Sequence, residues 1–116
     1  MIESQKFNFY LSDGFNVIKI MESKASINIA QEFRDEIFKL LDKGYNKIIV
    51  YFSATQMMDS TFLGALVVSF KKCIESGGQI HLFAVPDSIK LFFGLTKLDK
   101  IFNIFENIED AKKAFK

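Results

Sequence analysis

Short apolar runs alternate with segments of helical periodicity along nearly the whole sequence. Lys47–Phe52 (Lys-Ile-Ile-Val-Tyr-Phe) is an almost continuous apolar run, which is typical of a central strand covered on both faces. Gln79–Val85 is the next strand-like run, and a helix-like segment at about Thr61–Ser76 separates the two. Strands that are joined through a helix pair in parallel with a right-handed crossover. The alternation therefore predicts a parallel sheet with helices packed on it.

A hairpin and one further strand extend this order. Phe7–Leu11 and Phe15–Met21 are strand-like and are separated by Ser12-Asp13-Gly14, a turn sequence. Ile101–Phe105 is expected to form the last strand. The resulting order is β-β-α-β-α-β-α-β-α, an α/β fold with a mixed, mostly parallel sheet in which the hairpin supplies the antiparallel pairing. A length of 116 residues suits one domain, which we expect to cover residues 1–116.

Four helices are expected in this order. Asn28 and Gln31 resemble a capping box at the start of the first, and Gly44 suits its end. The second helix ends at Gly77-Gly78. A short helix from Pro86 to Phe93 and a final helix capped by Asn107 follow. The expected core positions are Ile29, Phe33, Ile37, Leu40 and Leu41 in the first helix and Leu63, Leu66, Val67, Phe70 and Ile74 in the second.

Charge and apolar content exclude several classes of function. Fifteen Lys and Arg against fourteen Asp and Glu give a net charge of +1, which does not support direct binding of nucleic acid. The strongly apolar runs, such as Phe62–Phe70, are shorter than the roughly 20 residues that cross a bilayer, so no membrane association is expected. The first residues do not resemble a signal peptide. We therefore expect a cytoplasmic protein.

The supply of chemically active side chains also limits enzymatic chemistry. One His and one Cys cannot provide the three or four ligands of a His/Cys metal site, and no metal or other cofactor is expected. His81 lies in a strand-like run with no nucleophile implied nearby, so we interpret it as structural. Cys73 falls near the buried stripe of the second helix and is expected to be an inert thiol. The prediction is a protein without catalytic residues.

One segment carries a specific signal: Met58-Asp59-Ser60-Thr61-Phe62-Leu63-Gly64-Ala65-Leu66. Asp59 and Ser60 lie where a loop gives way to a helix, and either side chain can cap that helix. Ser60 is also a candidate phosphorylation site, because a helix N-terminus favours a negative group. A phosphate there adds about −1.5 to −2 charge and can exclude a partner that fits the neutral serine. Capping and phosphorylation both remain open from the residues alone.

This segment resembles the phospho-switch motif of STAS domains, in particular that of the bacterial anti-sigma factor antagonists. The resemblance continues in register through Ala30–Phe33, Lys47–Ser53, Gly77–Ile80, Leu91–Phe102 and Glu109–Ala111, which together span nearly the whole chain.

The resemblance implies a regulatory function for the segment. Ser60 would be phosphorylated by an anti-sigma factor serine kinase, which the unphosphorylated protein binds and so keeps from its sigma factor. A phosphatase, in this family of the PP2C type, would reset the cycle. Asp59 would shape or cap the loop, and Thr61 would be a neighbouring hydroxyl and a weaker candidate for modification. The family also implies a monomer in free solution.

Three positions depart from the family pattern. Phe62 stands where a Gly usually follows the Ser-Thr pair, Tyr51 replaces an Asp before the switch, and Ser26 replaces an acidic residue ahead of the first helix. Phe62 would put a large apolar side chain beside the acceptor hydroxyl, where it would either block an ordinary kinase or form the centre of a different interface. The alternative is a degenerate STAS domain that binds a small ligand, such as a nucleotide or lipid, or another regulatory partner without a phospho-switch. A cavity lined by several of the 14 Phe would favour that alternative.

A partner surface is expected on the outer side of the second helix. A helical wheel places Ala65, Val68 and Lys72 there, with Phe62 and Ser69 at the flanks. If exposed, the strip formed by Phe62, Ala65 and Val68 would be an interaction surface next to Ser60. Burial of Phe62 and Ala65 by neighbouring loops is the other possibility. Met58 is assigned to loop packing or to the same surface, since methionine adapts to partners.

Overall fold

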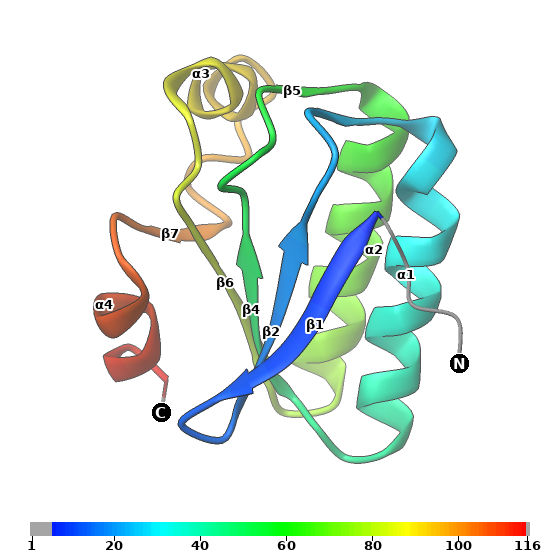
Figure 1. Cartoon of the computed structure of the whole chain (residues 1–116), viewed down its shortest axis with the longest axis vertical. Coiled ribbons are helices and arrows are strands. Elements are labelled where there is room, and N and C mark those ends of the chain that lie inside the picture. The colour runs from blue at the N-terminus through cyan, green and yellow to red at the C-terminus, as the bar shows by residue number, and fades with distance from the viewer. Residues whose placement is uncertain (1–5, 116) are drawn as a thin grey trace.

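The computed structural model describes residues 6–115 and has the predicted α/β architecture. A five-stranded sheet has the order β1-β2-β4-β6-β7 (Figure 1). The β1–β2 hairpin is antiparallel and every other pairing is parallel, as the sequence predicts. The strands are β1 (Phe7–Ser12), β2 (Phe15–Ile20), β3 (Lys24–Ala25), β4 (Lys47–Tyr51), β5 (Met57–Met58), β6 (Gln79–Phe83) and β7 (Asn103–Phe105), and the helices are α1 (Ile27–Asp42), α2 (Ser60–Glu75), α3 (Asp87–Leu95) and α4 (Ile108–Lys113).

The helices cover the two faces of the sheet unequally. α1 and α2 lie side by side on one face, and the short helix α4 lies on the other (Figure 1). The parallel strands run toward the end of the sheet where α3 lies and where α1 and α2 begin. The larger core is on the side of α1 and α2, where buried residues of β2, β4 and β6 meet both helices. A smaller cluster around Ile49 and Ala111 lies under α4.

A second, two-stranded sheet was not expected from the sequence. β3 and β5 pair in parallel, with Lys24 opposite Met57 and Ala25 opposite Met58. Two residues are too few to show strand periodicity, and these strands form because distant segments meet. Each directly precedes a long helix, so the small sheet holds the starts of α1 and α2 beside one another.

Two predicted element starts differ from the structure. The cap of α1 is Ser26, whose hydroxyl oxygen accepts from the Asn28 N–H at 3.3 Å, so the expected Asn28–Gln31 capping box is wrong. The Gln31 side chain instead bonds Asp35 and Arg34 within the helix. The last strand starts at Asn103, two residues late, because the N–H groups of Ile101 and Phe102 donate to the Leu98 carbonyl in a turn.

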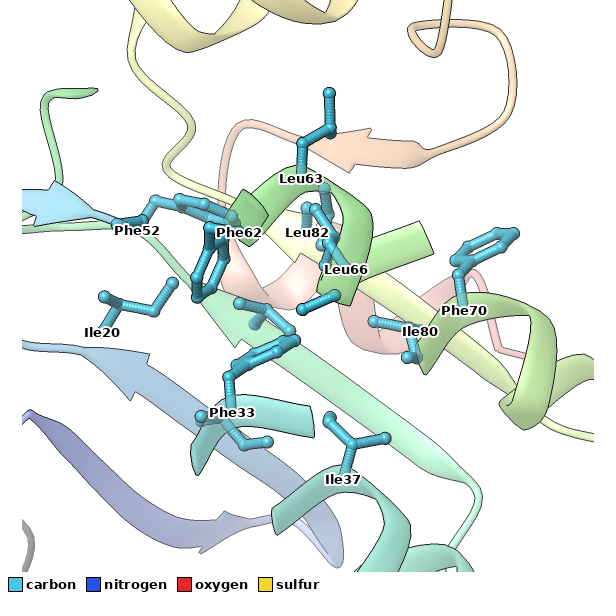
Figure 2. Packing of buried hydrophobic residues seen from close by; sticks show 14 of the residues in the cluster. Ile20, Phe33, Ile37, Phe52, Phe62, Leu63, Leu66, Phe70, Ile80 and Leu82 are labelled. Atoms are coloured by element: carbon cyan, nitrogen blue, oxygen red, sulfur yellow. The ribbon is translucent and has the colours of Figure 1, made fainter. Parts of the chain in front are cut away.

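The large core is rich in phenylalanine rings that contact one another. Phe62 projects from the first turn of α2 toward Phe33 of α1, and their ring centroids are 4.9 Å apart (Figure 2). Phe102 packs edge-on against both Phe70 and Phe93. Direct ring contacts of this kind fill the large core between the sheet and the helices that cover it. On α2 the predicted stripe is wrong at Ile74, which is 52% exposed, because the neighbouring Cys73 faces the core instead.

Candidate functional site

The site is built around Asp59, whose carboxylate joins the starts of the two long helices. Its Oδ1 accepts from the Phe62 N–H at 2.9 Å, which makes Asp59 the N-cap of α2. Its Oδ2 accepts from the Ile27 N–H at 2.9 Å, at the first residue of α1. The Asp59 N–H in turn donates to the Ala25 carbonyl at 3.0 Å. The predicted support role of Asp59 is therefore a clasp between α1 and α2.

The clasp perturbs the ionisation of Asp59. Partial burial of the carboxyl group by itself raises its pKa, but the N–H groups of Phe62 and Ile27 and the charge of Lys24 outweigh that effect. The net result is a pKa below the ordinary value of 3.8. Asp59 is consequently a carboxylate at neutral pH, and both of its oxygens are engaged by backbone donors.

Ser60 is the first residue of α2 and is exposed. Because Asp59 serves as the cap, the Ser60 hydroxyl is not needed for that purpose. In the described part of the chain, residues 6–115, this hydroxyl makes no side-chain hydrogen bond. Thr61, the neighbouring hydroxyl, is also exposed and lies beside a groove between the helices. Of the two capping candidates that the sequence left open, the structure thus assigns the cap to Asp59.

Phe62 does not stand beside the acceptor hydroxyl as the sequence suggested. Its side chain is fully buried and points away from the surface into the core between α1, α2 and the sheet (Figure 2). The expected obstruction of Ser60 by Phe62 is therefore absent. The other two departures are also accommodated: Ser26 caps α1, and Tyr51 stacks on Phe83 with ring centroids 4.2 Å apart in β4 and β6.

A surface groove of 340 Å³ lies between α1 and α2, and one of its lining residues is Thr61, which follows Ser60. Both helices contribute residues at the spacing i, i+3, i+4, i+7, which places each set on one helix face. The groove is open because small residues such as Ala30, Gly64 and Ala65 lie on the facing sides of the two helices. Gln31 and Arg34 add polar groups to the α1 wall. The lining residues are Ile27, Ala30, Gln31 and Arg34 of α1 and Thr61, Gly64, Ala65 and Val68 of α2.

The predicted partner surface is therefore partly wrong. Phe62 and Ser69 are fully buried, and the Ser69 hydroxyl oxygen has no hydrogen-bond partner within residues 6–115. In the first turn of α2, Thr61 and Gly64 face outward next to Ser60, whereas Phe62 faces the core. The remaining members of the predicted surface differ in exposure: Val68 and Lys72 are exposed, Met58 is half-buried, and Ala65 is largely buried but lines the groove.

Two residues that hold the loop before Ser60 were not singled out from the sequence. Thr55 is fully buried, and its hydroxyl donates to the Glu22 carbonyl at 2.9 Å. Ser88 of α3 donates to the Gln56 carbonyl at 2.7 Å. A polar break at residues 53–56 was the only signal in the sequence. These bonds tie the loop to the end of β2 and to α3, so Ser60 is presented on a fixed support.

His81 and Cys73 have the structural roles predicted for them. His81 is buried under α4, where its Nδ1 lies 2.8 Å from the Ala111 carbonyl oxygen and its ring stacks on Phe115 at 3.8 Å. Burial lowers the pKa of His81, although the bond to Ala111 opposes that effect. Cys73 is buried in α2, and burial raises the pKa of its thiol to about 11.

Residues 6–115 provide neither a cluster of three or more His, Cys, Asp or Glu side chains suited to a metal ion nor a helix long and apolar enough to cross a membrane.

Comparison with known proteins supplies the family. The family model described as the STAS domain matches residues 12–111. A curated protein of Thermotoga maritima, named "Putative anti-sigma factor antagonist", is 33% identical over 96 residues, which cover 82% of this chain and 85% of the relative.

Solved structures agree with this match. A crystal structure of the same description from Thermotoga maritima superposes with a TM-score of 0.81 at 32% identity, and the match covers 92% of each chain. The Bacillus cell fate determinant SpoIIAA, solved in its phosphorylated form, has a TM-score of 0.71 over 92% of this chain and 97% of its own. At 16% identity, that second likeness concerns the fold alone. The chain belongs to the STAS domain family, among the relatives of the anti-sigma factor antagonists, which are regulatory binding proteins and not enzymes.

Proposed function

We propose that this protein binds an anti-sigma factor that is also a serine kinase, and that phosphorylation of Ser60 ends the binding. In the unphosphorylated state the protein holds the anti-sigma factor and so leaves the sigma factor free. A phosphatase, of the PP2C type in the family resemblance, restores the binding state by removing the phosphate.

The observation that carries the proposal is the position of Ser60. Ser60 is exposed at the start of α2, and the next residue, Thr61, lines the groove between the two long helices. Exposed Ile27 and Val68 add apolar surface to that groove, and Arg34 adds a cation. Apolar contacts around an arginine are the composition that protein interfaces favour. A partner seated in the groove would contact Ser60 directly.

A phosphate at Ser60 would change this surface without unfolding the domain. The α2 cap is supplied by Asp59, so no native hydrogen bond of Ser60 has to break. The adjoining starts of α1 and α2 both present the positive end of a helix dipole, which favours a phosphate. The folded state therefore tolerates the modification.

The same phosphate would oppose binding. About two negative charges would appear at the edge of the groove and reverse the formal net charge of +1. A partner matched to a neutral serine would have to desolvate that group or face it with like charge, which costs several kcal/mol. Such a cost lowers affinity by orders of magnitude. The fold would persist and the partner would leave.

The first test is modification by the cognate anti-sigma factor kinase and ATP. We expect one added phosphate by intact-mass analysis, located on Ser60 by peptide mapping. Thr61→Val is the matched control because it removes the neighbouring hydroxyl, and it should still be modified. Modification of Ser60→Ala, or no modification of the unaltered protein, would refute the assignment.

The second test is the affinity for the unphosphorylated partner, measured by calorimetry. Ser60→Asp should weaken binding at least about tenfold, which corresponds to about 1.4 kcal/mol. Asn8→Asp adds the same unit of charge on exposed β1, away from the groove, and should leave the affinity unchanged. Equal affinities for all three proteins would exclude a charge switch at Ser60.

A further inference from the structure

β1 is an edge strand whose outer side carries apolar residues and no charge. Among the described residues 6–115, it pairs only with β2 in the five-stranded sheet. Its sequence, Phe-Asn-Phe-Tyr-Leu-Ser, contains no charged residue and no proline, and its register with β2 continues without a bulge. Phe9, Tyr10 and Leu11 are 40%, 37% and 67% exposed. Proteins normally protect such an edge with charge, proline, a bulge or a very short strand.

The opposite edge of the sheet is protected in that way. β7 has only three residues, Asn103–Phe105, and therefore offers a short template for pairing. β1 has six residues and is the longer of the two edge strands. The contrast makes β1 the place where this sheet can accept another strand.

The hairpin fixes which main-chain groups of β1 face outward. Asp13 and Gly14 both have positive φ, 52° and 84°, as in a two-residue hairpin turn. In such a turn the flanking residues Ser12 and Phe15 exchange hydrogen bonds, and every second residue along β1 repeats that pattern. The Met21 N–H to Lys6 carbonyl bond of 2.7 Å has the same phase. Phe9 and Leu11 therefore direct their N–H and C=O groups to the free edge.

We propose that β1 pairs with β1 of a second copy of this chain, antiparallel and about a two-fold axis, so that the two sheets become continuous. In the register that uses the outward groups of Phe9 and Leu11, each Phe9 faces Leu11 of the second copy and exchanges two hydrogen bonds with it. Tyr10 then faces Tyr10 of the second copy on the axis. Both faces of the new strand pair gain apolar cross-strand contacts.

Self-pairing suits this edge better than pairing with an unrelated segment. A two-fold pair needs a strand that is complementary to itself when reversed, and the apolar centre of β1 meets that requirement. Lys6 and Asp13, which flank the strand, already form ion pairs with Glu32 and Lys112 of the same chain, so the apolar centre of β1 carries the pairing. A single strand pair buries little surface, so the dimer belongs to the weak class.

Sedimentation over a range of concentrations tests the association of the full chain. We expect the average mass to rise from the monomer toward the dimer between about 10 μM and about 1 mM, the range of weak complexes. Leu11→Lys should keep the protein monomeric because it puts charge on the edge. The matched control is Leu95→Lys on α3, where the leucine is 75% exposed, and it should dimerise like the unaltered protein. A monomer at every concentration, or a dimer that survives Leu11→Lys, would overturn the proposal.

Disulfide formation tests the register and does not depend on the behaviour of Leu11→Lys. Tyr10→Cys places two thiols on the axis, with Cα atoms about 4.5 Å apart, which suits a disulfide. Asn8→Cys is the matched control on the same strand and face, and its two thiols would be roughly 13 Å apart. We expect Tyr10→Cys to cross-link at least about tenfold faster under mild oxidation, with buried Cys73 unreactive. Equal rates would refute this pairing. Neither measurement involves an anti-sigma factor, so the result is independent of the proposed function.

Discussion

Replacing Asp59 tests how strongly one carboxylate holds the two long helices. Asp59→Ala removes the cap of α2 at Phe62 and the bond to Ile27 of α1. Loss of an N-cap costs about 1 kcal/mol, and loss of a hydrogen bond to a charged group costs a similar amount when water can replace it. Ile27 is 64% exposed, so water can reach its neighbourhood. We expect a loss of about 2 kcal/mol in the free energy of unfolding, measured by urea denaturation.

Asp59→Asn separates the two contributions. Asparagine is a good N-cap and can still accept from the Phe62 N–H. Its amide has one oxygen, so the Ile27 N–H would face an NH₂ group that cannot accept. The expected loss is therefore about 1 kcal/mol, between the unaltered protein and Asp59→Ala. If Asp59→Asn is as stable as the unaltered protein, the bond to α1 contributes nothing; if Asp59→Ala is no less stable than Asp59→Asn, the cap of α2 contributes nothing.

Because the pKa of Asp59 is lowered in the folded protein, the stabilisation that its carboxylate provides should depend on pH. A carboxyl group whose pKa is lower in the folded state stabilises the fold fully above its unfolded pKa. That stabilisation is lost as the pH falls through 3.8 and below, because the unfolded chain takes up the proton more readily. The stability difference between the unaltered protein and Asp59→Asn should therefore shrink from pH 6 toward pH 3, about the range in which an aspartate titrates. A difference that stays constant over this range would refute the assignment.

Four further changes have outcomes that can be measured in the same way. Phe62→Ala should destabilise the protein by about 3–5 kcal/mol in urea denaturation, since it empties a fully buried site against Phe33; a loss below 1 kcal/mol, typical of a surface site, would contradict the packing. Gly64→Ala should stabilise α2 by up to about 1 kcal/mol, because a Cβ there meets no atom within 4 Å; calorimetry should show weaker partner binding, and unchanged affinity would exclude the groove as the contact. Ser69→Ala should raise the free energy of unfolding by about 1 kcal/mol because it removes a buried hydroxyl that has no hydrogen-bond partner within residues 6–115; lower stability would reveal a partner. The lowered pKa of His81 means that stability should fall as the pH drops below about 6.5, and His81→Gln should abolish that slope if His81 causes it.

The main elements were predictable because their signals are local. Apolar runs in β4 and β6 and the helical spacing in α1 are properties of consecutive residues. The parallel order then follows from the alternation of strand and helix. The turn at Asp13-Gly14 is equally local, since glycine adopts a positive φ freely and aspartate tolerates one.

The clasp could not be predicted, because it joins segments that are far apart in the sequence. Asp59 and Ile27 are separated by 32 positions, and the strands that bring them together have two residues each. The rotation of α2 about its axis also depends on this contact. A helical wheel gives the relative directions of Phe62, Gly64 and Ala65 but not which of them meets α1. The cap at Asp59 and the ring of Phe33 decide that Phe62 turns inward.

The inward turn of Phe62 favours the charge switch that we propose at Ser60. Had the phenylalanine faced outward, a partner could have gained most of its affinity from that ring, and one phosphate would have changed a smaller share of the contact energy. With Phe62 in the core, the surface next to Ser60 consists of Thr61, Gly64 and the groove. Asp59 adds a charge there, but both of its oxygens already accept backbone hydrogen bonds. In the proposed switch, a phosphate on Ser60 would therefore dominate the electrostatics of this end of the groove, and a partner would distinguish the two states by that group.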